Sequence, residues 1–140
     1  MASSNPKKLT YKFRYDFSVD GGSHSDSNQG LAGNGAGVVT PADATATIPE
    51  NAIITGCITY VSTAFAGSNC NLAIGCGGAA IVASTDFDNA VFADEKVTVH
   101  SVGDKTTSAA RPTITFDTAS ATDGVMDVVL EYYLVSELGA

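Results

Sequence analysis

The sequence predicts an all-β fold: a single antiparallel β-sandwich, jelly-roll or Greek-key like, built from seven to nine short strands. Apolar residues recur at every second position in several segments, and almost nowhere at the period of about 3.6 residues that marks a helix. Turn-forming Gly, Asn, Asp and Pro separate these segments. With 140 residues, the chain is long enough to bury one hydrophobic core, so a single domain is expected.

The clearest strand covers residues 9–19, where aromatic and aliphatic residues alternate strictly with polar ones. We expect its apolar side, which carries Tyr11, Phe13, Tyr15 and Phe17, to pack in the core. An aromatic interface stripe or a sugar-stacking platform is the alternative interpretation of the same four side chains.

Polar segments divide the chain into an arm, a domain and a tail. Residues 1–8 show no apolar periodicity and are expected to form a flexible N-terminal arm. Ser, Gly, Asn and Asp dominate residues 23–37, which predicts a long polar loop inside a β-sandwich domain that spans residues 9–135. Residues 136–140 are expected to form a C-terminal tail.

The remaining strands are predicted from the same alternation and from their content of β-branched residues. Residues 79–83 fit either a strand or the start of a helical turn, and residues 86–93 fit a loop or a single helical turn. Within residues 96–102, Val97 and Val99 share one face of the predicted strand. The other predicted strands cover residues 38–40, 45–48, 53–65, 70–76, 113–116 and 125–135.

The formal net charge is −8, from 15 acidic and 7 basic side chains. Broad contact with nucleic acid needs clustered Lys and Arg, so no direct nucleic-acid partner is expected. Four of the seven basic residues, Lys7, Lys8, Lys12 and Arg14, lie near the N-terminus. We interpret them as candidate docking residues for an acidic partner surface. Alternatively, they keep an exposed edge strand solvated and prevent it from mis-pairing.

The three cysteines, Cys57, Cys70 and Cys76, form no CxxC pair, and their odd number signals neither a zinc site nor a disulfide framework. Buried, reduced thiols are expected, as in a protein made in a reducing cytosol. No segment approaches the roughly 18 consecutive apolar residues of a membrane span, and the first residues hold no apolar signal-peptide core. No membrane partner is therefore expected.

The sequence predicts no catalytic, metal or cofactor site. Residues 23–26 contain the residue types of a catalytic triad, including His24, but neighbours in sequence do not hold triad geometry. Residues 86–89 lack the glycine and the glutamate of a calcium loop. The glycine-rich residues 33–37 lack the Lys-Ser/Thr ending of a phosphate-binding loop. We interpret His100 as a surface or hydrogen-bonded core histidine.

Five short segments, spread over most of the chain, resemble the capsid decoration (cement) proteins of tailed bacteriophages, a family of small β-sandwich proteins. Residues 23–46 are longer and more polar than expected for that family. The similar segments are Tyr15-Asp16-Phe17-Ser18-Val19-Asp20-Gly21-Gly22, Pro49-Glu50-Asn51-Ala52-Ile53-Ile54-Thr55, Leu72-Ala73-Ile74-Gly75, Lys105-Thr106-Thr107 and Val129-Leu130-Glu131-Tyr132-Tyr133.

The resemblance implies a non-enzymatic homotrimer on the exterior of a bacteriophage capsid, where it bridges major capsid protein subunits and stabilises the shell. It also implies synthesis in the host cytoplasm. Such a role needs binding surface rather than an active site. Two alternatives stay open: another phage structural module, such as a tail or head-fibre protein that binds a receptor or a carbohydrate, and a small hydrolase that uses His24 or His100.

Overall fold

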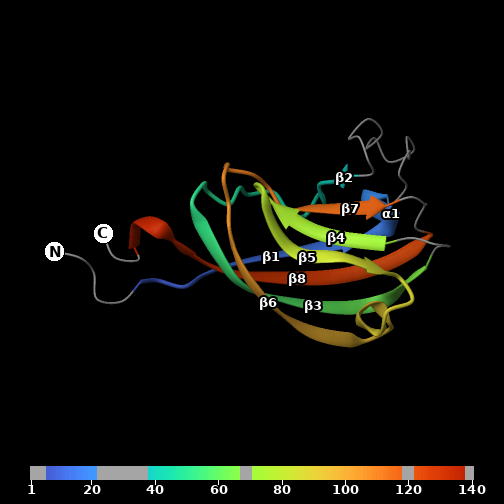
Figure 1. The fold of residues 1–140 in the computed structure, drawn as a ribbon. Helices are drawn as coiled ribbons and strands as arrows, with labels where there is room; N and C mark the ends of the chain where they lie inside the picture. Colours follow the sequence, from blue (N-terminus) through green and yellow to red (C-terminus); the bar gives the residue numbers. More distant parts are fainter. Residues whose placement is uncertain (1–5, 22–37, 67–70, 118–121, 138–140) are drawn as a thin grey trace.

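The computed structural model describes residues 6–21, 38–66, 71–117 and 122–137, which form two antiparallel four-stranded sheets packed face to face (Figure 1). The predicted all-β sandwich is therefore confirmed. The first sheet has the order β1 (Leu9–Asp16), β8 (Asp123–Leu134), β3 (Ala52–Ala66) and β6 (Lys96–Lys105). The second has the order β2 (Val38–Val39), β7 (Thr113–Asp117), β4 (Asn71–Cys76) and β5 (Ala79–Asp86).

The connections between strands are jelly-roll like. Each strand lies in the opposite sheet from the one before it, except β5, which follows β4 within the second sheet. Strand β8 pairs with β1 on one side and with β3 on the other, so the first and last strands of the described chain lie side by side in the first sheet. The outer strands of that sheet are β1 and β6, which leaves the sheet with two edges.

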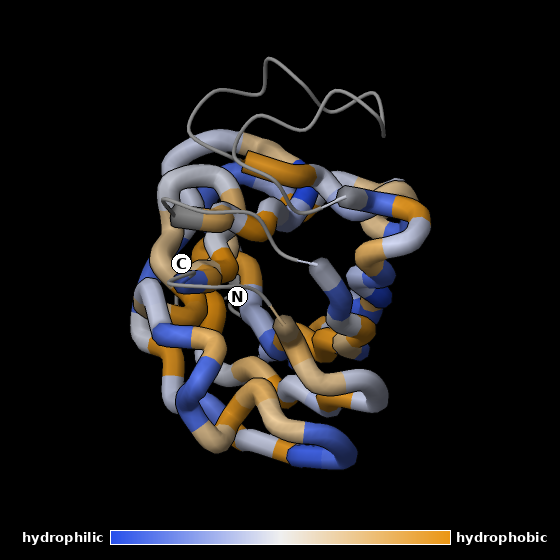
Figure 2. Tube along the Cα trace, turned by 90° about the vertical axis from the view of Figure 1, so that its right-hand side faces the viewer, coloured by the Kyte–Doolittle hydropathy of each residue, from blue (hydrophilic) through white to orange (hydrophobic). Residues whose placement is uncertain are grey.

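The core lies between the two sheets. Phe13 and Tyr15 of β1 are completely buried, and Tyr11 and Phe17 pack partly buried against the same core. This confirms the core interpretation of the aromatic residues on the first strand. The alternation of apolar and polar residues along the strands can be followed in Figure 2. Buried rings contributed by both sheets and by the turn after β5 form one cluster: Tyr15, Phe65, Phe87, Phe92 and Phe116.

The first predicted strand was too long, because β1 ends at Asp16 rather than continuing to residue 19. The carboxylate of Asp16 accepts hydrogen bonds from the N–H and the hydroxyl of Ser18, at 2.9 Å and 2.7 Å. This side-chain cap begins a short helical turn, α1 (Phe17–Asp20). The turn breaks the alternation, and Val19 is consequently 56% exposed instead of lying in the core.

The structure decides between the alternatives that were predicted for two other segments, and it shows that the strand predicted for a third is wrong. Residues 79–83 belong to strand β5, and residues 86–93 contain a single 3₁₀ turn, η1 (Ala90–Phe92). The carboxamide oxygen of Asn89 accepts a hydrogen bond from Val91 N–H at 3.1 Å and caps this turn. Residues 45–48 are not a strand, since their sheet contact is an isolated bridge between Ile48 and Ala110.

Several predictions fall outside the described residues. Residues 1–5 of the predicted arm and residues 138–140 of the predicted tail lie there, as does the predicted loop at 23–37, which includes His24 and residues 33–37. Cys70 also lies outside them. These parts of the domain scheme stay predictions.

On strand β6, the apolar residues face solvent and the polar residues face the core side, which is the reverse of the usual arrangement. Val97 and Val99 point to solvent and are 56% and 75% exposed, whereas Thr98 and His100 face the core side and are half-buried. The register explains this orientation, because Thr98 and His100 pair with the buried Thr59 and Cys57 of β3. The imidazole Nε2 of His100 lies 3.0 Å from the hydroxyl of Thr59, so the inward polar side chain finds a partner.

Candidate interaction face

The predicted docking residues lie along one edge of the first sheet. Lys12 and Arg14 alternate with the buried Phe13 and Tyr15 on β1, so both point away from the core and are exposed. Lys7 and Lys8 directly precede this strand and are also exposed. The structure therefore places Lys12 and Arg14 on the outward side of β1, with Lys7 and Lys8 in the segment that leads into this strand.

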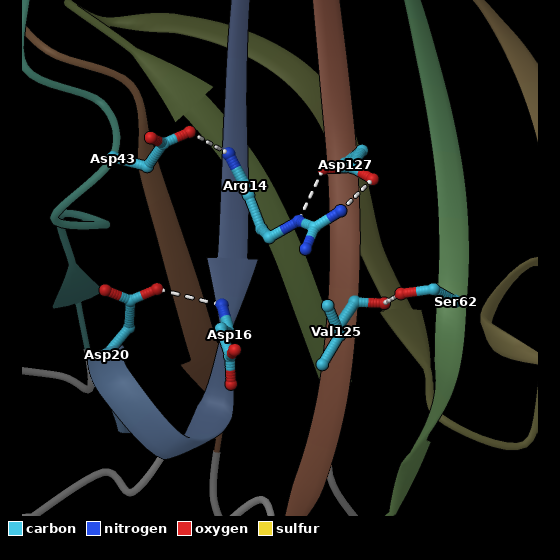
Figure 3. A network of polar contacts seen from close by, with 7 residues as sticks. All are labelled: Arg14, Asp16, Asp20, Asp43, Ser62, Val125 and Asp127. Atoms are coloured by element: carbon cyan, nitrogen blue, oxygen red, sulfur yellow. Dashed lines mark hydrogen bonds and ion pairs between the residues drawn. The ribbon is translucent and has the colours of Figure 1, made fainter.

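Two of these cations pair with carboxylates of the neighbouring strand β8. Arg14 donates two parallel hydrogen bonds to Asp127, with Nε–Oδ1 at 2.8 Å and Nη2–Oδ2 at 3.0 Å (Figure 3). The Nζ atom of Lys8 lies 3.4 Å from Oε2 of Glu131. Hydrogen bonding from Arg14 lowers the pKa of the Asp127 carboxyl group, against the opposing effect of burial. The polar part of the face is thus a strip of alternating charges and not an isolated basic patch.

The other half of the same face is apolar. Sheet register aligns Lys12, Val129, Ile58 and Val99 in one row across the four strands. It aligns Arg14, Asp127, Tyr60 and Val97 in the next row. Ile58 is 37% exposed and stands beside Val99, which is the most exposed large hydrophobic residue in the described part of the chain. We define the outer face by these two rows, which change from charged at β1 to apolar at β6.

Sequence reasoning found the charged half of the outer face but missed the apolar half. Val97 and Val99 were recognised as sharing a side of their strand, and nothing in the alternation itself says which side is buried. Ile58 belongs to a long β-branched segment that reads as buried. The neighbouring Thr98 and His100 pointed the wrong way, because polar side chains normally take the solvent side of a strand, whereas here they face the core side.

Carboxylates close the β1 edge next to the charged half (Figure 3). Asp43 accepts a hydrogen bond from the backbone N–H of Arg14 at 2.8 Å, and Asp20 accepts one from the N–H of Asp16 at 2.9 Å. The second oxygen of Asp20 accepts the N–H of Ala42, also at 2.9 Å. Burial is the main cause that raises the pKa of Asp20.

An open pocket of about 380 Å³ lies over this edge. Four of its polar side chains already have partners, since Arg14 holds Asp127 while Asp20 and Asp43 accept backbone N–H groups. A ligand would have to compete with these bonds. The lining residues are Lys12, Arg14, Asp16, Val19, Asp20, Asp43 and Asp127.

Several titratable groups outside this face have structural partners or are buried. Burial raises the pKa of the Cys57 thiol to about 12 and that of Cys76 to about 11, and both cysteines are free. Burial also lowers the pKa of His100, which agrees with its interpretation as a hydrogen-bonded core histidine. Asp86 accepts the N–H of Asp88 at 2.7 Å and so acts as a turn former.

No group of three or more His, Cys, Asp or Glu side chains among the described residues is arranged to hold a metal ion. No helix in the described part of the chain is long and apolar enough to cross a membrane.

Comparison with known proteins gives structural matches without sequence matches. No protein-family model and no curated protein matches the sequence. One similar structure is the capsid asymmetric unit of cyanophage Pam1, with a TM-score of 0.56 and 16% identity over 96% of this chain and 89% of that chain. Another is the capsid of Ralstonia phage GP4, with a TM-score of 0.56 and 12% identity over the same shares, 96% and 89%. At such low identity, the likeness establishes a shared fold.

Proposed function

We propose that this protein is a non-enzymatic structural component of a bacteriophage virion, seated on the outside of the capsid as a decoration or cement protein. In this role it contacts subunits of the major capsid protein and stabilises the shell by bridging them. The protein is made in the host cytoplasm and assembles there, where its buried thiols Cys57 and Cys76 stay reduced.

Two independent lines support a virion role. Five short segments of the sequence resemble the decoration proteins of tailed phages, and the fold resembles chains of two phage capsid structures over nearly the full length of each. A shared fold does not by itself imply a shared function, so a virion role also requires a surface that fits the task.

The outer face of the first sheet is the observation that carries the proposal. Val97, Val99 and Ile58 expose apolar surface on a sheet face that has no covering layer among the described residues. Full burial of each side chain would contribute about 1.5 kcal/mol or more, which is enough for a few of them to anchor a contact. Arg14 and Asp127, one row away, give the contact a polar rim.

The charged half of the face fits a supporting role. Lys8 and Arg14 are already paired within the chain, so Lys7 and Lys12 are the cations that a capsid carboxylate would meet first. Each exposed pair contributes at most about 1 kcal/mol and weakens with salt. Repetition of the contact in a homotrimer, the oligomer that we propose, would multiply such small terms.

Reconstruction by electron cryomicroscopy of the particle whose genome encodes this chain tests the proposal. The expected result is an eight-stranded sandwich outside the shell, present in threes, with Val97 and Val99 against the major capsid protein. Density for the chain in a tail or head fibre would favour the other structural role. Absence of the chain from purified particles would overturn a virion function altogether.

A further inference from the structure

The two edge strands of the first sheet, β1 and β6, differ in whether their outward backbone groups have hydrogen-bond partners. In an antiparallel sheet, successive residues direct their N–H and C=O groups alternately to the two sides of the strand. The N–H of Arg14 bonds outward to Asp43, so Arg14 turns its backbone groups away from β8. In the row Arg14, Asp127, Tyr60 and Val97, the backbone N–H and C=O groups therefore point in opposite directions on successive strands.

This alternation ends with Val97 directing its N–H and C=O away from β3, toward the open side of the sheet. Val99 and Ser101 have the same direction, because the register from Lys96 to Ser101 is unbroken. Among the described residues, no hydrogen bond to a neighbouring element engages the backbone groups of these three residues. Figure 1 shows β6 along the rim of the sheet, with no strand beyond it.

The β6 edge also lacks the devices that keep natural edges from pairing. Such edges carry inward charges, prolines, bulges or a covering segment. Residues 97–103 contain no Lys, Arg, Asp, Glu or Pro. The first register shift lies beyond Ser101, so the stretch from Val97 to Ser101 is regular. Its two valines are the most favourable residue type for cross-strand packing with an added strand.

We propose that the edge from Val97 to Ser101 accepts an extended segment of another polypeptide as an additional strand of the first sheet. The segment carries apolar side chains at alternate positions, which continue the row formed by Ile58 and Val99. Basic residues flank it, because the exposed charges at the two ends of this edge are three carboxylates, Asp94, Glu95 and Asp104, against two lysines, Lys96 and Lys105. This mode of recognition takes its affinity from backbone hydrogen bonds and its specificity from alternate side chains.

Charge argues for another protein rather than a second copy of this chain. Each copy has a formal net charge of −8. Antiparallel self-pairing centred on Val99 would also set Asp94 of one copy opposite Asp104 of the other at both ends. The source of the segment, a neighbouring shell protein, rests on the proposed function. The chemistry of the segment does not depend on that function.

Binding of synthetic peptides to the full-length, ¹⁵N-labelled protein tests this chemistry without any phage particle. The probe is Lys-Lys-Thr-Val-Thr-Val-Thr-Lys-Lys, and a matched peptide has glutamate in place of each lysine. The lysine peptide is expected to slow amide exchange at Val97, Val99 and Ser101 about tenfold or more, while leaving Arg14 and Asp16 unchanged. The glutamate peptide should bind about fivefold more weakly or worse.

Two variants separate backbone pairing from nonspecific apolar contact. Val99→Pro removes one outward N–H without breaking a bond to β3, and should weaken lysine-peptide binding about fivefold or more. Val99→Thr keeps that N–H and should bind within about twofold of the wild type. Circular dichroism and the unfolding midpoint establish that both variants are folded.

Three outcomes would overturn the inference: no change in exchange at the three amides, equal binding by Val99→Pro, or a β6-mediated dimer in sedimentation without peptide. If only the peptides fail to bind, the proposed capsid location is still tested separately by the particle reconstruction. Conversely, peptide binding at β6 stands even if the chain proves to lie elsewhere in the virion.

Discussion

The two edges of the first sheet are built in opposite ways. At β1, the carboxylates of Asp43 and Asp20 accept the outward N–H groups of Arg14 and Asp16. At β6, the corresponding groups have no such partner among the described residues, and Val99 adds exposed apolar surface. One edge is closed to further pairing, and the other is open.

This difference separates the parts of the sheet that maintain the fold from the parts that are free to bind. The closed edge uses a buried carboxylate and a charged strip, so changes there should affect stability. The open edge and the neighbouring apolar rows contribute little to the core, so changes there should affect association.

The largest expected effect is at the closed edge. Asp20→Ala leaves two backbone N–H groups, those of Asp16 and Ala42, without their acceptor in a largely buried site. We expect the free energy of unfolding to fall by about 3 kcal/mol, measured by urea denaturation. A loss below about 0.5 kcal/mol would show that Asp20 does not hold the edge.

The same substitution on the two faces of the sheet should give unequal losses. Val128 on β8 is completely buried, whereas Val99 on β6 is 75% exposed. Val128→Thr places a hydroxyl in the core and should lower the free energy of unfolding by about 1–2 kcal/mol. Val99→Thr should change it by less than about 0.5 kcal/mol. Equal losses would mean that β6 is packed as tightly as the core.

Acidification should weaken the charged strip. The pKa of Asp127 is lowered in the folded protein by hydrogen bonding from Arg14, so its stabilising effect exists above the ordinary carboxyl pKa and is lost as pH falls through the lowered value. Asp127→Asn removes this effect. The stability difference between wild type and variant should therefore shrink between about pH 5 and pH 2.

Asp20 also titrates on acidification, but it does not disturb the comparison of wild type with Asp127→Asn. Its pKa is raised, so its linked contribution has the opposite sign: it is present at low pH and is lost as pH rises through the raised value. Both proteins in the comparison retain Asp20, and its effect cancels in the difference. A difference that grows on acidification would contradict the assignment of the Arg14–Asp127 pair.

The smallest expected effect is thiol reactivity next to the open edge. Cys57 pairs with His100 across β3 and β6, and burial raises its thiol pKa to about 12. In the Cys70→Ser variant, Cys57 and Cys76 should react with a thiol reagent at about pH 8 only after unfolding. Rapid labelling of Cys57 in the native protein would show that β6 detaches from β3 and that the open edge is not a stable platform.

Alternation along the chain predicted much of this fold because it reports which residues share a face. It identified the buried side of β1, with Phe13 and Tyr15, and the presence of strand β8. It failed at Asp16, where a local side-chain hydrogen bond begins a helical turn and outweighs the continuing pattern.

The candidate face was only partly predictable, since its key features depend on long-range pairing. Arg14 was predicted as a candidate docking residue, but its partner Asp127 lies 113 residues away in the sequence. The outward direction of Val97 and Val99 depends on the polar side chain that β3 presents to the core, Thr59. Neither relation leaves a signal in a single short segment.

Occupancy on capsids that lack the protein tests the central claim, docking through the outer face, most directly. The variant Val97→Glu/Val99→Glu places two charges at exposed positions of this face, and Ala83→Glu/Ser84→Glu places the same charges at exposed positions of β5 in the other sheet. Both should fold with nearly wild-type stability. We predict that the first variant loses about tenfold or more in occupancy, since it buries unpaired charge at the contact, and that the second binds like wild type. Undiminished occupancy of the first variant would contradict docking through the outer face.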